Sequence, residues 1–211
     1  TVRTSRRTVE HAVALLGRGR LEALLLAVAV RGALPRTMGF DAQQFWTASA
    51  RRATTARRLA AVLHPSTQAE SFTAALLQDM AVPMLHQAHT TRYASVWAAW
   101  QNSDRSTCLT ELERSTFGWD HSQVGSWMCA AWSFPEGLTE AIGGHHGTVQ
   151  GLMAPPAVML SSQIRDADGI DALDGMIAQL EGDYGIKADD AVELLEESFR
   201  DGEAIARLLT P

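Results

Sequence analysis

The stretch from Asp41 to Leu63, DAQQFWTASARRATTARRLAAVL, decides the fold class of this chain. Apolar and small residues recur on one side at helical spacing, while arginines and threonines occupy the other side. This spacing predicts an amphipathic helix that Asp41 caps and that His64 ends. The side expected to be buried holds Phe45, Ser49, Ala53, Ala56, Ala60 and Leu63, and the opposite side holds Arg51, Thr54, Thr55 and Arg58.

Helical patterns also dominate the rest of the chain. Thr67 and Glu70 have the spacing of a capping box, which predicts a second helix that Pro83 breaks before a short helix to about His89. Neither a strand-like alternation nor an internal repeat interrupts the pattern. We expect an all-α multi-helix bundle of about eight to ten helices, folded as a single domain over residues 1–211. The further expected helices are 91–101, 107–116, 121–132, 135–143, 155–166, 170–181 and 188–209.

Charge is unevenly distributed along the chain. The net charge is −6, yet residues 1–58 hold 11 arginines against three acids, a balance of +8 that leaves −14 for the remainder. We expect the basic and acidic parts to complement each other, within one chain or between chains. A basic face for nucleic acid is the weaker alternative, because no nucleic-acid motif accompanies the arginines and the whole chain is acidic. That face would consist of Arg51, Arg52, Arg57 and Arg58.

Apolar segments and cysteines indicate the compartment. The longest strongly apolar run, Leu24 to Val30, is too short to span a bilayer, and the first residues do not form a signal peptide. We therefore expect a cytoplasmic protein without a membrane partner. Cys108 and Cys129 belong to no Cys/His cluster, so we expect two buried free thiols.

Two blocks of sequence together resemble a known superfamily. The first is LLQDMA at Leu76 to Ala81, and the second is a later spaced pattern. In order and spacing they resemble the HD metal-dependent phosphohydrolases, and most closely the HD-related output domain (HDOD) family of bacterial signalling proteins. HDOD domains usually have a further helical layer upstream, which we expect this chain to lack. The later pattern consists of Glu113, Gly118, His121, Gly125, Trp132, Pro135 and His145-His146.

The resemblance implies that several metal ligands have been lost. HD enzymes bind the metal through a His on one helix, a His-Asp pair on the next and an Asp on a late helix. Here the matching positions are Ala48 or Ser49, then Gln78-Asp79. The last position is Ser162 or Gln163, and Asp166 could serve only if its helix shifts. A neutral amide is a poor ligand beside imidazole, so these losses favour a non-catalytic domain.

The resemblance also implies that His121 and His145 or His146 occupy positions of additional ligands in two-metal HD enzymes. Together with Asp79 they would offer three ligands, which can bind zinc weakly. We expect instead that these histidines fix the helix packing, with no bound metal and no cofactor.

These observations predict a non-catalytic bacterial regulatory module that acts through protein–protein contact in a signalling pathway. A small-molecule effector is a further possible partner, in a vestigial pocket. An exposed subset of the six Trp residues would provide a contact surface for the protein partner. The alternative is a divergent phosphohydrolase of nucleotides or phosphodiesters, with Glu113 or Asp120 as the base and a metal held by the surviving ligands. The vestigial pocket comprises Ala48, Gln78, Asp79, His121, His145, His146 and Gln163.

Overall fold

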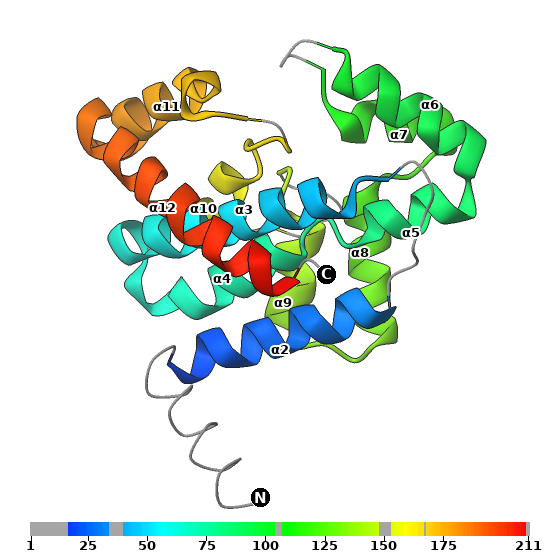
Figure 1. Ribbon diagram of the computed structural model, residues 1–211, viewed down its shortest axis with the longest axis horizontal. Coiled ribbons are helices and arrows are strands. Elements are labelled where there is room, and N and C mark those ends of the chain that lie inside the picture. The colour runs from blue at the N-terminus through cyan, green and yellow to red at the C-terminus, as the bar shows by residue number, and fades with distance from the viewer. Residues whose placement is uncertain (1–16, 34–39, 104–106, 148–152, 167, 210–211) are drawn as a thin grey trace, which may run out of the picture.

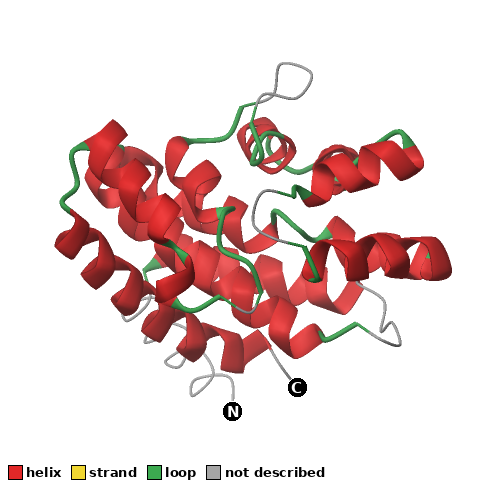
Figure 2. Ribbon diagram, turned by 90° about the horizontal axis from the view of Figure 1, so that it is seen from above, coloured by secondary structure: helices red, strands yellow, loops and turns green. Residues whose placement is uncertain are grey.

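The computed structural model describes residues 17–33, 40–103, 107–147, 153–166 and 168–209. Within these ranges helices follow one another through short loops, without a strand (Figure 2). The all-α prediction is confirmed. The helices are α2 (Arg18–Ala33), α3 (Ala42–Leu63), η1 (Pro65–Thr67), α4 (Gln68–Leu77), α5 (Ala81–Ala88), α6 (Thr90–Gln101), α7 (Leu109–Phe117), α8 (His121–Ala131), α9 (Glu136–Gly143), α10 (Pro156–Ser161), η2 (Ile170–Ala172), α11 (Asp174–Tyr184) and α12 (Ala188–Leu209).

Helix α3 is the central element of the fold, and α12 crosses it in Figure 1. The predicted N-cap is confirmed, because the Asp41 carboxylate accepts a hydrogen bond from the Gln44 N–H at 2.9 Å. The predicted exposed side is wrong in part. Thr54 and Thr55 are as fully buried as Ala53, because α4, α10 and α12 cover α3 from several directions.

Close contact between α3 and α12 depends on small residues. A Cβ on Gly202 would lie 2.8 Å from the Cα of Arg51, so only glycine allows the two backbones this separation. Beside this contact the Thr54 hydroxyl donates to the Ser198 carbonyl at 2.7 Å, which satisfies a polar group in a fully buried position. The long C-terminal helix is thereby fixed against the helix that carries Arg52.

Ion pairs between the same two helices explain the uneven charge. Arg58 binds Glu197 at 2.5 Å and Asp201 at 2.9 Å, and Arg51 binds Glu203 at 2.9 Å. The prediction that basic and acidic parts of the chain complement each other is confirmed for these residues. The pairs also weigh against the alternative of a basic nucleic-acid face, because its arginines are held by acids of the same chain.

Two groups of buried side chains form the interior. The larger lies between α2, α3, α4, α5, α8 and α9, and includes Phe72, Leu76 and Ile142. The smaller joins α3 to α10, α11 and α12 through Leu59, Leu160 and residues of the last helices. No helix among the described residues is long and apolar enough to cross a membrane.

Three local predictions need correction. The capping box at Thr67 and Glu70 does not form, because the Thr67 hydroxyl donates to the His64 carbonyl instead. Helix α10 stops at Ser161 rather than continuing to residue 166, and the following irregular segment changes where Asp166 lies. Cys108 is exposed, whereas Cys129 is a buried free thiol as expected.

Candidate metal centre

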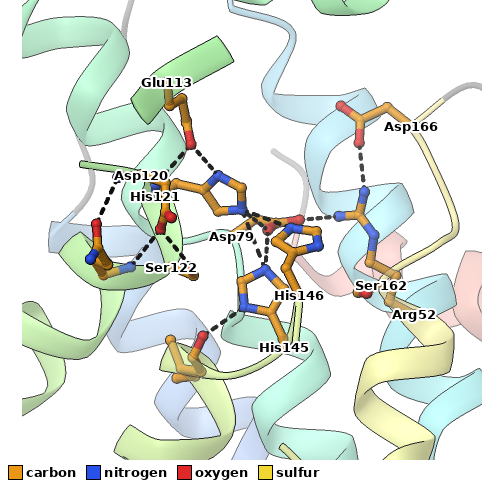
Figure 3. A network of polar contacts seen from close by, with 12 residues as sticks. Arg52, Asp79, Glu113, Asp120, His121, Ser122, His145, His146, Ser162 and Asp166 are labelled. Atoms are coloured by element: carbon orange, nitrogen blue, oxygen red, sulfur yellow. Dashed lines mark hydrogen bonds and ion pairs between the residues drawn. The ribbon is translucent and has the colours of Figure 1, made fainter. Parts of the chain in front are cut away.

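Asp79, His121, His145 and His146 converge in the described structure (Figure 3). Their potential ligand atoms all lie within 4.8 Å of one another. Asp79 lies in the turn between α4 and α5, His121 is the first residue of α8, and the two adjacent histidines follow α9. Three separate parts of the chain therefore supply one carboxylate and three imidazoles, a donor set that suits a transition metal.

The start of α8 positions His121. The Asp120 carboxylate caps this helix by accepting from the Gln123 N–H, and the Gln123 side-chain oxygen accepts from the Asp120 N–H. On the imidazole itself, Nδ1 lies 2.7 Å from Oε2 of Glu113, which also accepts from the His121 backbone N–H at 2.8 Å. Glu113 is fully buried, and its other oxygen accepts from the Tyr93 hydroxyl. The ring of His121 is thus fixed with Nε2 directed at the centre.

The end of α9 positions the paired histidines. Gly144 ends the helix, and a Cβ there would lie 2.7 Å from the Cα of Met153, so the backbone passes close to the segment before α10. The His145 Nδ1–H donates to the Ile142 carbonyl at 2.6 Å, and this bond turns Nε2 toward Asp79. Metal-binding histidines commonly have such a partner on the nitrogen that does not face the metal.

Distances between the ligand atoms fit a tetrahedral ion. The His121 Nε2 lies 3.3 Å from Oδ1 of Asp79, 3.3 Å from His145 Nε2 and 3.1 Å from His146 Nε2, and His145 Nε2 lies 3.3 Å from the same Oδ1. Ligands about 2.0–2.1 Å from a tetrahedral zinc are separated by roughly 3.3 Å. The donor chemistry and these four distances therefore fit a metal ion, while all the separations within the group lie within 4.8 Å.

Hydrogen bonds outside the centre direct two imidazole lone pairs into it. Because Nδ1 of His121 and of His145 each faces an acceptor, Nε2 of each neutral ring carries a lone pair that points at Asp79 and at the other ring. A proton or a metal ion can relieve this repulsion. Burial alone lowers the pKa of His121, but Glu113 and Asp79 outweigh burial and raise that pKa to about 10.

The second oxygen of Asp79 has a different partner. Its Oδ2 accepts from Nη1 of Arg52 at 2.6 Å, while Nη2 of the same guanidinium lies 3.2 Å from Oδ1 of Asp166. Burial raises the pKa of Asp79, yet Arg52 and then His121 and His145 hold that pKa well below its usual range. Asp79 is therefore an anion shared between a guanidinium on one side and imidazoles on the other.

A cavity of about 230 Å³ opens onto this centre. Asp79, His121, His146 and Arg52 line one part of it, and aromatic side chains, among them Trp97, line another. His146 is the exposed residue of the group and lines the cavity, whereas His121 and His145 are buried.

The structure separates the predicted pocket residues into two groups. Asp79, His121, His145 and His146 form the group of converging ligand atoms, and Ala48, Gln78 and Gln163 carry no side chain of that ligand class. Ala48 is buried within α3, and neither polar atom of the buried Gln78 side chain has a hydrogen-bond partner among the described residues. Gln163 lines the cavity, but its amide bonds to the Gln179 side chain at 2.9 Å.

Sequence reasoning missed Arg52 and gave other roles to two acids. Glu113 and Asp120 were expected as candidate bases, but Glu113 holds the His121 ring and Asp120 caps α8, and both are fully buried. From the sequence, Arg52 is named only as part of the alternative basic face for nucleic acid. Small residues recur every four positions along α3, and this spacing does place Arg52 on a buried side. Nothing in the sequence indicates that Asp79 and Asp166 are its partners.

Comparisons with known proteins bear on the family and the fold. The model of the HDOD domain family matches residues 2–148. A candidate phosphohydrolase from Shewanella amazonensis SB2B has a similar structure, with a TM-score of 0.76 and 24% identity over 96% of this chain and 77% of that one. A candidate signal transduction protein from Marinobacter aquaeolei VT8 has a TM-score of 0.67 and 16% identity over 92% of this chain and 45% of that one. At these identities the two likenesses show the fold. No curated protein matches the sequence.

Proposed function

The chain belongs to the HDOD family, and from this premise we propose that it is a non-catalytic regulatory module of bacterial signal transduction with a structural metal centre. The single observation that carries the proposal is the number of protein ligands. Asp79, His121, His145 and His146 offer four ligand atoms within 4.8 Å of one another. Structural zinc sites are closed by four protein ligands, whereas catalytic sites keep a position open for water.

The chain's own residues account for the structural role. The four ligands join the α4–α5 turn, α8 and the end of α9, three segments that are far apart in the sequence. A bound ion would accept the Nε2 lone pairs of His121 and His145, and would so hold these segments together. The two candidate bases, Glu113 and Asp120, are occupied in positioning α8 and its first histidine.

Contact with a partner protein is supported by two exposed indoles. Trp127 lies on α8 with 54% of its surface exposed, and Trp132, which follows α8, is 39% exposed. Trp is enriched among residues that dominate the affinity of protein interfaces. Because α8 also begins with His121, a surface on this helix is joined directly to the metal centre.

The metal content of protein purified without chelators tests the proposal. We expect about one zinc ion per chain, and cobalt substitution should give the intense visible absorption of a tetrahedral N/O site. Removal of the ion by a chelator should lower the melting temperature, since the metal stabilises only the folded chain. The loaded protein should not hydrolyse nucleotides or phosphodiesters. Turnover that disappears in Asp79→Ala, or the absence of metal after incubation with zinc, manganese and iron, would contradict the proposal.

The alternative function, a divergent phosphohydrolase, is favoured by one observation. The cavity of about 230 Å³ reaches Asp79, His121 and the exposed His146, so a small substrate has access to the centre. If His146 left the centre, three ligands would remain and one position would be open to water. Hydrolysis that increases in His146→Ala while the metal is retained would favour this alternative.

The partner-contact part has its own experiment. Wild-type protein and a Trp127→Ser/Trp132→Ser variant are immobilised and compared for capture of proteins from a bacterial lysate. A partner identified with the wild type should then bind the variant at least about tenfold more weakly when both are purified, since interface Trp residues often contribute 2 kcal/mol or more. Equal affinity would place the contact surface elsewhere on the molecule.

A further inference from the structure

Arg52 is a buried cation beside the centre. Its side chain is 4% exposed, and Nε donates to the Ile164 carbonyl at 2.7 Å. Its two terminal nitrogens reach two different carboxylates, with Nη1 at 2.6 Å from Asp79 and Nη2 at 3.2 Å from Asp166. The guanidinium is therefore fixed by the Ile164 carbonyl and by two carboxylates. Figure 3 shows the two ion pairs.

The carboxylate of Asp79 is divided between this guanidinium and the metal centre. Oδ2 faces Arg52, while Oδ1 lies 3.3 Å from Nε2 of both His121 and His145. Two cations placed on opposite sides of one carboxylate can share its charge, and here one of the two is part of the chain. Asp166 is the second anion of this arrangement, and no imidazole among the described residues is paired with it.

We propose that the Arg52 guanidinium takes the place of a second metal ion, so that the centre accepts a single divalent cation on the Oδ1 side of Asp79. The inference rests on the proposed function for the presence of the first ion. It goes further by assigning Arg52 the role of a positioning residue that sets the number of ions.

Charge and chemistry support this role. Two carboxylates that converge in a buried place need a cation, because burying unpaired charges is costly. Oxygen pairs of this kind suit manganese or magnesium, which would bind there if the place were free. A guanidinium is always charged and offers donors in a fixed fork, so it holds both acids permanently and cannot be lost to a chelator.

The test counts manganese ions per chain by equilibrium dialysis and metal analysis in wild type and Arg52→Met. The variant is expected to bind one ion more than the wild type, because its two carboxylates are then free to hold a metal. Adding Asp166→Asn to Arg52→Met should abolish the extra ion. Arg58→Met is the matched control, because Arg58 lies on the same helix but is paired with Glu197 and Asp201, away from the centre.

A second pair of variants separates charge from shape. Arg52→Lys keeps the positive charge and should bind no extra ion, whereas the neutral Arg52→Gln should bind one. If Arg52→Met is unfolded without metal, recovery of its helical circular dichroism with manganese supports the same role. Failure to recover, or a folded variant with the wild-type number of ions, overturns the inference.

The design distinguishes this inference from the proposed function. Wild type without any ion would end the proposal of a structural metal centre. An extra manganese ion in Arg52→Met, measured against that same wild type, would still assign Arg52 the place of a cation. One ion in both proteins would leave the metal centre in place and reject the role of Arg52.

Discussion

Two halves of the centre differ in what holds Asp79. On the side of α8 and α9, imidazoles of His121 and His145 face Oδ1, and each ring is fixed by a partner outside the centre. On the side of α3 and α10, the guanidinium of Arg52 faces Oδ2 and pairs with Asp166. The first half has the form of a metal site, and the second half has the form of a buried ion pair.

The difference shows that loss of ligand residues need not leave a void. Ala48, Gln78 and Gln163 stand where the family resemblance places ligands, but Ala48 is buried within α3 and the Gln163 amide bonds to Gln179. An arginine from the next turn of α3 supplies positive charge to the carboxylate instead. One carboxylate can thus serve a coordination site and an ion pair at once, and the two halves can be tested separately.

The largest expected effect breaks the α8 half. His121→Ala should abolish metal binding and lower the free energy of unfolding by about 3–5 kcal/mol, because it removes the imidazole that pairs with the buried Glu113 carboxylate. Urea denaturation and metal analysis measure the two effects. The control is His89→Ala, an exposed histidine that stacks on Phe117, which should cost less than about 1 kcal/mol. Retained metal in His121→Ala would remove this residue from the ligand set.

A smaller change in the same half keeps the ligands and alters their support. Glu113→Gln should weaken metal affinity about 10–100-fold, since the amide holds the His121 ring less firmly and gives it less negative charge. Competition with a chromophoric chelator measures this affinity. Glu111→Gln, an exposed position of the same helix α7, should leave the affinity unchanged. Equal affinities in the two variants would mean that Glu113 does not tune the centre.

The turn that carries Asp79 also holds the buried amide of Gln78. Both polar atoms of this side chain are buried without a hydrogen-bond partner among the described residues. Gln78→Leu should therefore raise the free energy of unfolding by about 1–2 kcal/mol, because an unsatisfied buried polar group costs about that much. Thermal unfolding compares it with Gln87→Leu, an exposed position on α5 that should change little. Destabilisation by Gln78→Leu would indicate that the amide has a partner in solution.

The smallest effect concerns the exposed arginines that share α3 with Arg52. Arg58 is about a third exposed, and its partners Glu197 and Asp201 are more exposed still. Arg58→Ala should lower the free energy of unfolding by less than about 1 kcal/mol, and the loss should shrink at high salt. A double-mutant cycle with Asp201→Ala at two salt concentrations measures it. A coupling energy as large as that of Arg52 with Asp79 would mean that the pairs of α3 with α12 matter as much as its pair with the centre.

The sequence predicted most of the helices and part of the site. Helical periodicity gave α3 and α12 close to their observed bounds, since apolar spacing reports directly which side of a helix is buried. The motif order singled out Asp79, His121, His145 and His146, and these four residues lie together in the structure. The helical pattern was wrong at the end of α10, because it predicts a helix to residue 166. The chain leaves the helix after Ser161, and only this change of direction carries Asp166 to Arg52.

By itself the sequence determined the all-α class, the family and the identity of the surviving donors, because these depend on local spacing and residue chemistry. The tertiary structure alone decided how those donors are used. Whether an arginine lies on an exposed face or between two carboxylates depends on which helices cover it, and α3 is covered by three of them. The sharing of Asp79 between Arg52 and the histidines arises from contacts between residues 27 or more positions apart, which no local pattern records.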